Sequence, residues 1–245
     1  MRYSEYHDEL VRLLSEAGNP RVNEVLRQDR RSQMQYLGTS APDVRRVARG
    51  PLSFTRLLDA EVLQVWDDLW QNSPFGEVLF AAVEYYLPRV KKRADPALWA
   101  VVRGWSDRVE NWAHADSLGG LYSHILEAYP DEIYPQLQTW NRDENQWLRR
   151  ISLVSLIHYT GKNAVFLPPE KVLPLVSNCL DDRRYYVQKA VGWVLREMGH
   201  VYPAEIRRYI EDNVAVLSPG AFNRAIERRP ADERIELRRI RESAR

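Results

Sequence analysis

The sequence predicts an all-α protein, and two observations lead to this prediction. Between the breaks in the chain, apolar residues recur every three to four positions, which is the period of an amphipathic helix, and no segment sustains the period of two that a half-buried strand requires. The breaks are regular, because glycine, proline and aspartate residues divide the chain into segments of helical length. A β-sheet is therefore not expected.

The expected helices follow one another in pairs, and each pair is joined by a short break. The pairs recur at about 40 residues, a period typical of HEAT-type repeats. We therefore expect a right-handed helical solenoid of HEAT-like repeats, an α-α superhelix whose inner helices line a concave basic groove. The clearest helices are expected at residues 61–71, 76–87, 109–129, 144–159, 169–180 and 183–198.

The helix expected at 183–198 has the strongest pattern. Val187 and Val191 begin a stripe of apolar residues at helical spacing, so this stripe should pack in the core. Asp181 and Asp182 precede the helix, and we expect them to cap its amino end and to place negative charge in its first turn.

Length and composition place limits on the domain organisation. The chain has 245 residues, 44% of them hydrophobic, which is enough for one large domain. We expect this domain to cover residues 1–230, followed by an arginine-rich helix or tail at 231–245. The amino terminus has no apolar signal region and no apolar run is long enough to span a bilayer, so a soluble cytoplasmic protein is expected. The single cysteine, Cys179, is expected in the core.

The charge of the chain is unevenly distributed, although its net value is only +1. From Arg142 to the end, 19 Lys and Arg residues stand against 14 Asp and Glu residues, a net charge of +5. Such a part suits an anionic partner, although solvated surface charge alone also gives such imbalances. The sequence contains no glycine-rich phosphate loop, no serine or cysteine nucleophile motif and no histidine spacing typical of zinc, so we expect neither nucleotide binding nor a metal site.

Trp193 lies more than a quarter-turn away from the packing stripe of its helix. Tyr186, Lys189 and Arg196 share its side, so this face combines two aromatic rings with two cations. Such a face suits nucleic acid, because rings stack on bases and cations bind phosphates. The alternative is that Trp193 packs against an adjacent repeat.

Asp116 is a second residue that simple packing does not explain. On a helix it shares a face with Trp112, Ala113 and Gly120, which are apolar or small. An unpaired carboxylate is costly to bury, so this one either forms a salt bridge with an arginine or takes part in chemistry. His114 either tunes Asp116 or faces solvent, and we expect the latter because it lies off this face.

A third site is the pair Arg149 and Arg150, on a helix that is apolar around much of its circumference. Arginines in such a setting usually pair with acids or reach phosphates. Asp116, Arg150 and Trp193 are separated by 34 and 43 residues, and each separation is close to one repeat. We therefore expect the three sites on successive inner helices.

Together the three sites resemble the AlkD family of DNA alkylation repair glycosylases, from about residue 36 to residue 226. The motifs that carry the resemblance are Q-K-A-V-G-W-V-L-R-E at 188–197, W-L-R-R at 147–150, W-A-H-A-D at 112–116 and, more faintly, L-G-T-S-A-P-D-V-R at 37–45. The sequence departs from the family pattern at two places. Ala113 stands where the family often has an acid, and residues 29–31 are Asp-Arg-Arg where the family commonly has an aromatic residue that contacts DNA.

The resemblance implies a monofunctional glycosylase that hydrolyses the N-glycosidic bond of positively charged N3- and N7-alkylated purines in double-stranded DNA and so starts base excision repair. It implies a carboxylate that stabilises positive charge on the sugar, two flanking tryptophans, and no metal or organic cofactor. We expect a monomer of the bacterial cytoplasm. The residues expected at the site are Asp116, Trp112 and Trp193 for catalysis, and Arg150, Arg149, Lys189, Arg196 and Tyr186 for DNA binding.

Two other functions stay open at this point. The first is a binder of damaged or branched DNA that has the same fold but no catalysis. The second is a HEAT-type scaffold for protein partners, in which Trp193 packs and Asp116 forms a salt bridge. The three functions differ in whether Trp112, Asp116 and Trp193 converge on one basic cleft.

Overall fold

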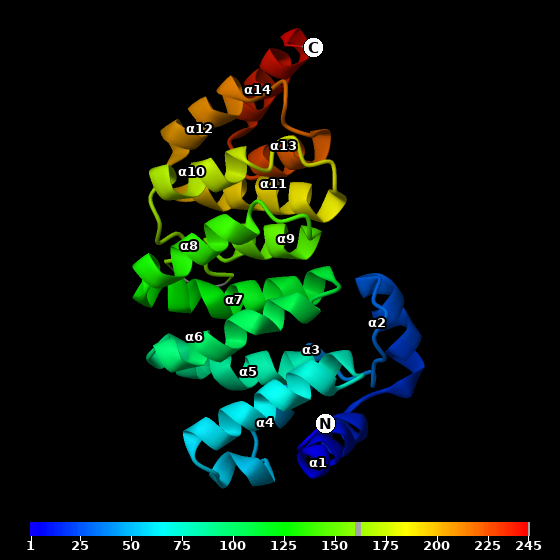
Figure 1. The fold of residues 1–245 in the computed structure, drawn as a ribbon. Helices are drawn as coiled ribbons and strands as arrows, with labels where there is room; N and C mark the ends of the chain where they lie inside the picture. Colours follow the sequence, from blue (N-terminus) through cyan, green and yellow to red (C-terminus); the bar gives the residue numbers. More distant parts are fainter. Residues whose placement is uncertain (160–162, 245) are drawn as a thin grey trace. The chain divides into compact units, whose positions relative to one another are not determined.

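Helices are the regular elements of this protein. The computed structural model describes residues 1–159 and 163–244, and within them two isolated β-bridges occur but no strand (Figure 1). The prediction of an all-α fold is confirmed. By their internal contacts the residues form two compact units, Met1–Ile125 and Leu126–Arg245, and each is described by itself below.

The first unit is centred on α5 (Gly76–Lys92), which packs against α3 (Ala41–Ala48) and α4 (Asp59–Asn72). Trp66 and Trp70 of α4 are fully buried. The other elements of this unit are α1 (Ser4–Ala17), α2 (Asn23–Arg30), α6 (Pro96–Val102), the part of α7 (Trp112–Ala128) up to Ile125, and the 3-10 helices η1 (Pro20–Val22), η2 (Ser53–Arg56) and η3 (Arg103–Arg108).

The second unit is centred on α11 (Tyr185–Val201), which packs against both α9 (Gln146–Val154) and α13 (Pro219–Ile226). The stripe predicted to pack in the core, beginning with Val187, is fully buried, and so is Cys179. The other helices of this unit are α8 (Pro130–Trp140), α10 (Pro169–Ser177), α12 (Pro203–Asp212) and α14 (Ala231–Ser243).

Two predictions about the ends of helices in the second unit are wrong. The helix expected at 144–159 is the shorter α9, because the side chain of Asn145 caps it and the chain leaves the helical path after Val154. The prediction that Asp181 and Asp182 cap α11 is also wrong. The cap position is held by Arg184 in an extended conformation, with no side-chain hydrogen bond to the first turn.

The arginine-rich carboxyl-terminal segment is a docked helix, α14. Its Leu237 is fully buried, and Arg241 donates hydrogen bonds to the backbone oxygens of Val214 and Leu217. These contacts order the segment through Ser243, and Arg245 lies outside the described residues.

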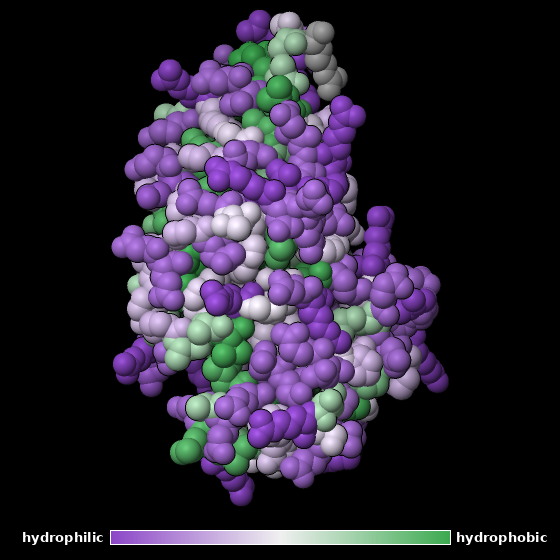
Figure 2. Space-filling view, viewed as in Figure 1, coloured by the Kyte–Doolittle hydropathy of each residue, from purple (hydrophilic) through white to green (hydrophobic). Residues whose placement is uncertain are grey.

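The molecular face drawn in Figure 2 is mainly hydrophilic, with scattered apolar side chains. Such scattered exposure is ordinary for a folded chain. Within residues 1–159 and 163–244, no helix combines the length and the apolar character that crossing a membrane requires.

Candidate active site

Helix α7 begins at Trp112, three residues later than the sequence predicts. Val109 has an extended backbone and ends the 3-10 helix before it. The side chain of Asn111 then accepts hydrogen bonds from the backbone N–H groups of Ala113 and His114, both at 3.0 Å, so it satisfies two of the free donors of the first turn. The cap fixes the phase of α7, and with it the direction of each later side chain.

One stripe of α7 is left open by the packing. Trp112, Ala113, Asp116, Ser117 and Gly120 are half-buried, whereas the residues between them are buried. These positions are adjacent at helical spacing, so Trp112 and Asp116 share one face as predicted. Three of the residues beside the carboxylate, Ala113, Ser117 and Gly120, have small side chains.

His114 does not face solvent, so that prediction is wrong. The ring is fully buried on the opposite side of α7 from Asp116, and its Nε2 lies 3.1 Å from the backbone oxygen of Gly76. Nδ1 lies 2.8 Å from the amide nitrogen of Asn111, so Nε2 carries the proton and Nδ1 accepts. Burial lowers the pKa of His114 to about 4, and the ring is neutral at pH 7.

The start of α7 is joined to the end of α2 by two contacts. The indole N–H of Trp112 donates to the backbone oxygen of Asp29 at 3.2 Å. The carboxylate of Glu110 accepts from the hydroxyl of Ser32 and from the backbone N–H of Gln33. Burial alone would raise the pKa of Glu110, but these hydrogen bonds outweigh burial and hold the pKa below its usual value. The segment where the family commonly has an aromatic residue therefore lies beside Trp112.

Three residues of the long motif on α11 hold the fold together. The buried side chain of Gln188 donates to the backbone oxygens of Cys179 and Asp182 and so fixes the loop before the helix. A Cβ on Gly192 would lie 2.6 Å from the backbone oxygen of Ala221, so this glycine allows α13 to approach closely. The guanidinium of Arg196 is buried and bonded to carboxylates, as described next.

Arg196 forms ion pairs with Glu197, its neighbour, and with Glu227 beyond the end of α13. Burial opposes its charge, but the hydrogen bonds from both carboxylates raise the pKa of Arg196 above its usual value. DNA binding by Arg196 stays a prediction, and within the second unit its guanidinium has two protein partners.

Two other residues of the motif, together with Tyr186, face outward. Trp193 is half-buried, and its ring centroid lies 5.8 Å from that of Tyr159. Lys189 is exposed, and its Nζ lies 5.3 Å from the ring centroid of Tyr185. Tyr186 is half-buried, with its ring 5.0 Å from that of Trp147 on α9. These three side chains are partly or fully exposed, as is Tyr185 beside them, so a ligand can reach this part of α11.

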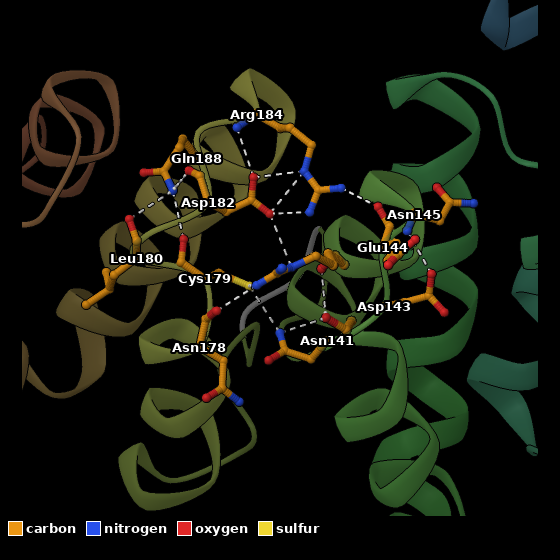
Figure 3. A network of polar contacts seen from close by, with 12 residues as sticks. Asn141, Asp143, Glu144, Asn145, Asn178, Cys179, Leu180, Asp182, Arg184 and Gln188 are labelled. Atoms are coloured by element: carbon orange, nitrogen blue, oxygen red, sulfur yellow. Dashed lines mark hydrogen bonds and ion pairs between the residues drawn. The ribbon is translucent and has the colours of Figure 1, made fainter.

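The two arginines of α9 are both bound within the second unit. Arg150 is buried and donates to the backbone oxygen of Tyr186, which ties α9 to the first turn of α11. Arg149 forms an ion pair with Asp182 at 3.2 Å and donates to the backbone oxygen of Asn178; Figure 3 labels these two partners. Arg184 pairs with the same carboxylate. DNA binding by Arg149 and Arg150 stays a prediction, and both now have a structural role as well.

The sequence matches the family model described as DNA alkylation repair enzyme over residues 10–228, which is most of the chain. The protein belongs to the DNA alkylation repair enzyme family. The search of curated proteins finds no match.

Solved structures share the fold of this DNA alkylation repair family member. A protein from Enterococcus faecalis, described as a predicted DNA alkylation repair enzyme, is 17% identical, with a TM-score of 0.73 over 87% of this chain and 97% of that one. The smu.31 protein of Streptococcus mutans UA159 is 18% identical, with a TM-score of 0.54 over 75% of this chain and 90% of that one. AlkD2 from Streptococcus mutans is 17% identical, with a TM-score of 0.53 over 77% and 87%.

The motif at 37–45 of this family member is structural. The buried carboxylate of Glu77 accepts hydrogen bonds from the consecutive backbone N–H groups of Leu37, Gly38 and Thr39. Gly38 has a φ of +78°, and a Cβ there would lie 2.1 Å from the backbone oxygen of Asn19. The motif therefore secures the segment before α3 against α5.

Other residues that build the site were not predicted. Asn111 and Glu110 set the start of α7 and hold α2 beside it, and Gln188 fixes the loop before α11. Asn111 directly precedes a helix, and this position is the ordinary signal for a capping residue. The motif at 188–197 includes Gln188 without showing its role, and no sequence signal points to Glu110, because both side chains bind groups that the fold brings to them.

Proposed function

We propose that the protein is a DNA glycosylase that removes positively charged N3- and N7-alkylated purines from duplex DNA and so starts base excision repair. The observation that carries this proposal is the open stripe of α7, on which Asp116 stands one turn from Trp112 among small residues. Membership of the DNA alkylation repair enzyme family supports a role in repair. The proposed enzyme acts as a monomer.

The proposed chemistry needs a fixed negative charge. Alkylation at N3 or N7 makes the base cationic, so the base leaves with the electron pair of the glycosidic bond and becomes neutral. The deoxyribose then has positive charge at C1′ and its ring oxygen, which the carboxylate of Asp116 stabilises. Water adds its oxygen to C1′ and loses a proton, and an abasic site remains. No metal or cofactor takes part in this scheme.

The tryptophans and the outward cations complete the proposed site. Trp112 and Trp193 attract the cationic base and sugar through their ring faces, an effect worth about 1–2 kcal/mol when water is excluded. Lys189 and Tyr186 contact the DNA backbone, and Arg150 holds Tyr186 in place.

The decisive experiment compares wild type with Asp116→Asn on duplex DNA that contains 7-methylguanine or 3-methyladenine. Released base is measured under single-turnover conditions, and DNA affinity is measured separately. We expect release to slow by at least about a hundredfold, as for other lost electrostatic partners of a transition state. We expect the affinity for DNA to stay within a few-fold, because the neutral amide has nearly the same shape.

Asp8→Asn on α1 is the matched control, since it removes an exposed carboxylate of the same unit. We expect it to release base at the wild-type rate. Equal release by Asp116→Asn and wild type would contradict the catalytic assignment. DNA binding by a wild-type protein that releases no base would instead favour a non-catalytic binder.

A further inference from the structure

The carboxyl end of α2 presents a cation held between two aromatic rings. The guanidinium carbon of Arg30 lies 4.6 Å from the ring centroid of Tyr36 and 4.7 Å from that of Phe80. The side chain is half-buried. Ring contacts hold a planar guanidinium in one orientation, so less freedom is lost when its N–H groups bind a ligand.

Arg30 differs from other arginines of the first unit in its partners. Arg27, one turn earlier on the same helix, forms an ion pair with Glu24, and Arg46 forms one with Asp43. Among residues 1–159 and 163–244, no carboxylate forms an ion pair with Arg30, and its Nη1 is buried without a hydrogen-bond acceptor. Desolvation therefore opposes this charge without the compensation that an acceptor oxygen would supply.

The position of Arg30 connects it with the open stripe of α7. The backbone oxygen of Asp29, the residue before Arg30, accepts a hydrogen bond from the indole N–H of Trp112. Phe80, one of its two rings, lies 4.4 Å from the ring of His114, which is neutral and does not repel the cation. Since α2 has no buried residue of its own, these contacts and the Glu110 bonds account for where Arg30 stands.

We propose that Arg30 binds a backbone phosphate of duplex DNA beside the α7 stripe, an inference that rests on the proposed function. No ion pair with a described carboxylate offsets the charge of this half-buried guanidinium, so a phosphate oxygen that meets its solvent-accessible side would supply the missing negative charge, and a planar guanidinium matches a phosphate in two-point geometry. Phe80 and Tyr36 act as positioning residues, because they hold the guanidinium without touching the DNA.

The test measures the affinity for a fluorescent, lesion-free duplex over a series of NaCl concentrations. The protein variants are wild type, Arg30→Ala, Arg30→Met and Phe80→Leu. The matched control is Arg27→Ala, which removes one charge from the same helix at a residue that already has an acid partner. Arg30→Met keeps the aliphatic stem between the rings, and thermal unfolding followed by circular dichroism establishes that each variant is folded.

We expect both Arg30 variants to reduce the slope of log K against log salt by about one and to weaken binding about fivefold to tenfold at moderate salt. Phe80→Leu should keep the slope and weaken binding less, since the charge stays but its orientation is lost. Arg27→Ala should match wild type in slope. An unchanged slope in both Arg30 variants, or an equal change in Arg27→Ala, would overturn the proposal.

The readout separates this inference from the proposed chemistry, because lesion-free DNA binding needs no base release. A changed slope with no base release by wild type would sustain the phosphate contact and defeat the glycosylase. Base release with an unchanged slope would defeat the contact at Arg30 alone.

Discussion

Helix α7 in the first unit and helix α11 in the second each carry a half-buried tryptophan, but the motifs around the two tryptophans serve different purposes. On α7 the short motif leaves a stripe of small residues with one carboxylate, Asp116. On α11 three residues of the long motif have structural contacts. Gln188 holds the loop before the helix, Gly192 allows α13 to approach closely, and Arg196 forms ion pairs with two carboxylates. These residues of the longer motif therefore serve mainly to pack the fold.

Under the proposed function, this difference separates the residues that pack the fold from the residue that takes part in the chemistry. A sequence motif is long when several of its side chains each make a different packing or hydrogen-bonding contact. A reacting carboxylate needs only its own position and room beside it, so its motif is short. Substitutions on the two helices should therefore have different consequences, stability on α11 and either chemistry or pH dependence on α7.

The largest effect on stability is expected from Gly192→Ala. The new Cβ would meet the backbone oxygen and Cα of Ala221 at 2.6 and 2.9 Å and the Cβ of Arg224 at 2.7 Å. Backbone atoms cannot rotate away, so α13 must shift, and we expect the free energy of unfolding to fall by about 3 kcal/mol, the upper part of the range for overpacking. Urea unfolding measures the change.

Gly220→Ala is the control for this substitution, because a Cβ at Gly220 has no neighbour within 4 Å. It should leave stability unchanged or raise it by up to about 1 kcal/mol. A Gly192→Ala protein as stable as this control would mean that α11 and α13 are not held as closely as the motif suggests.

His114 on α7 gives an effect of intermediate size that depends on pH. The pKa of His114 in the folded protein, about 4, lies below the usual value of 6.5. Its contribution to the free energy of unfolding is therefore complete above about pH 7 and is lost as the pH falls towards 4. In this window the unfolded chain binds a proton that the folded protein excludes. We expect the wild type to lose about 2 kcal/mol more unfolding free energy than His114→Gln between about pH 8 and about pH 5.

Denaturant unfolding at each pH measures this difference, and His200→Gln, which removes an exposed imidazole of the second unit, is its control. The control should follow the wild-type curve. If the free energy of unfolding of His114→Gln has the same pH dependence as the wild type, the His114 ring takes up a proton in the folded protein. The packing around α7 would then exclude water less well than the packing around α11.

The fold class and the core stripe of α11 could be predicted because periodicity reports directly which side of a helix is buried. The solvent-facing assignment of His114 failed for a physical reason. A residue opposite the open stripe of a helix points into the core when another helix covers that side, and periodicity does not say which side is covered. The sequence predicts the start of α7 too early because the apolar Val109 is itself extended and the capping residue, Asn111, comes two residues later.

The partners of the arginines could not be predicted either. Glu227 lies 31 residues beyond Arg196, and Asp182 reaches Arg149 only because the loop between α10 and α11 returns to α9. Spacing identifies a cation on a face, but not the acid that another helix brings to it. For the same reason Arg30 is distinguished from Arg27 by the structure and not by the sequence.

The smallest effect on stability is expected at Lys189. Within the second unit, this exposed cation can be compared with Arg149, a cation that is paired with an acid. Lys189→Gln removes an exposed charge next to the ring of Tyr185, so stability should stay within about 0.5 kcal/mol and DNA affinity should fall a few-fold, with a salt slope lower by about one. Arg149→Gln should do the reverse and lower the unfolding free energy by about 1 kcal/mol, because among the described residues of the second unit Asp182 then keeps Arg184 alone as an ion-pair partner. Salt titrations of DNA binding and urea unfolding of both variants measure the two effects. Equal salt slopes for the two variants would show that an arginine paired with an acid binds DNA as well as an exposed lysine does. The exposure of Lys189 would then no longer be a reason to assign it to DNA binding.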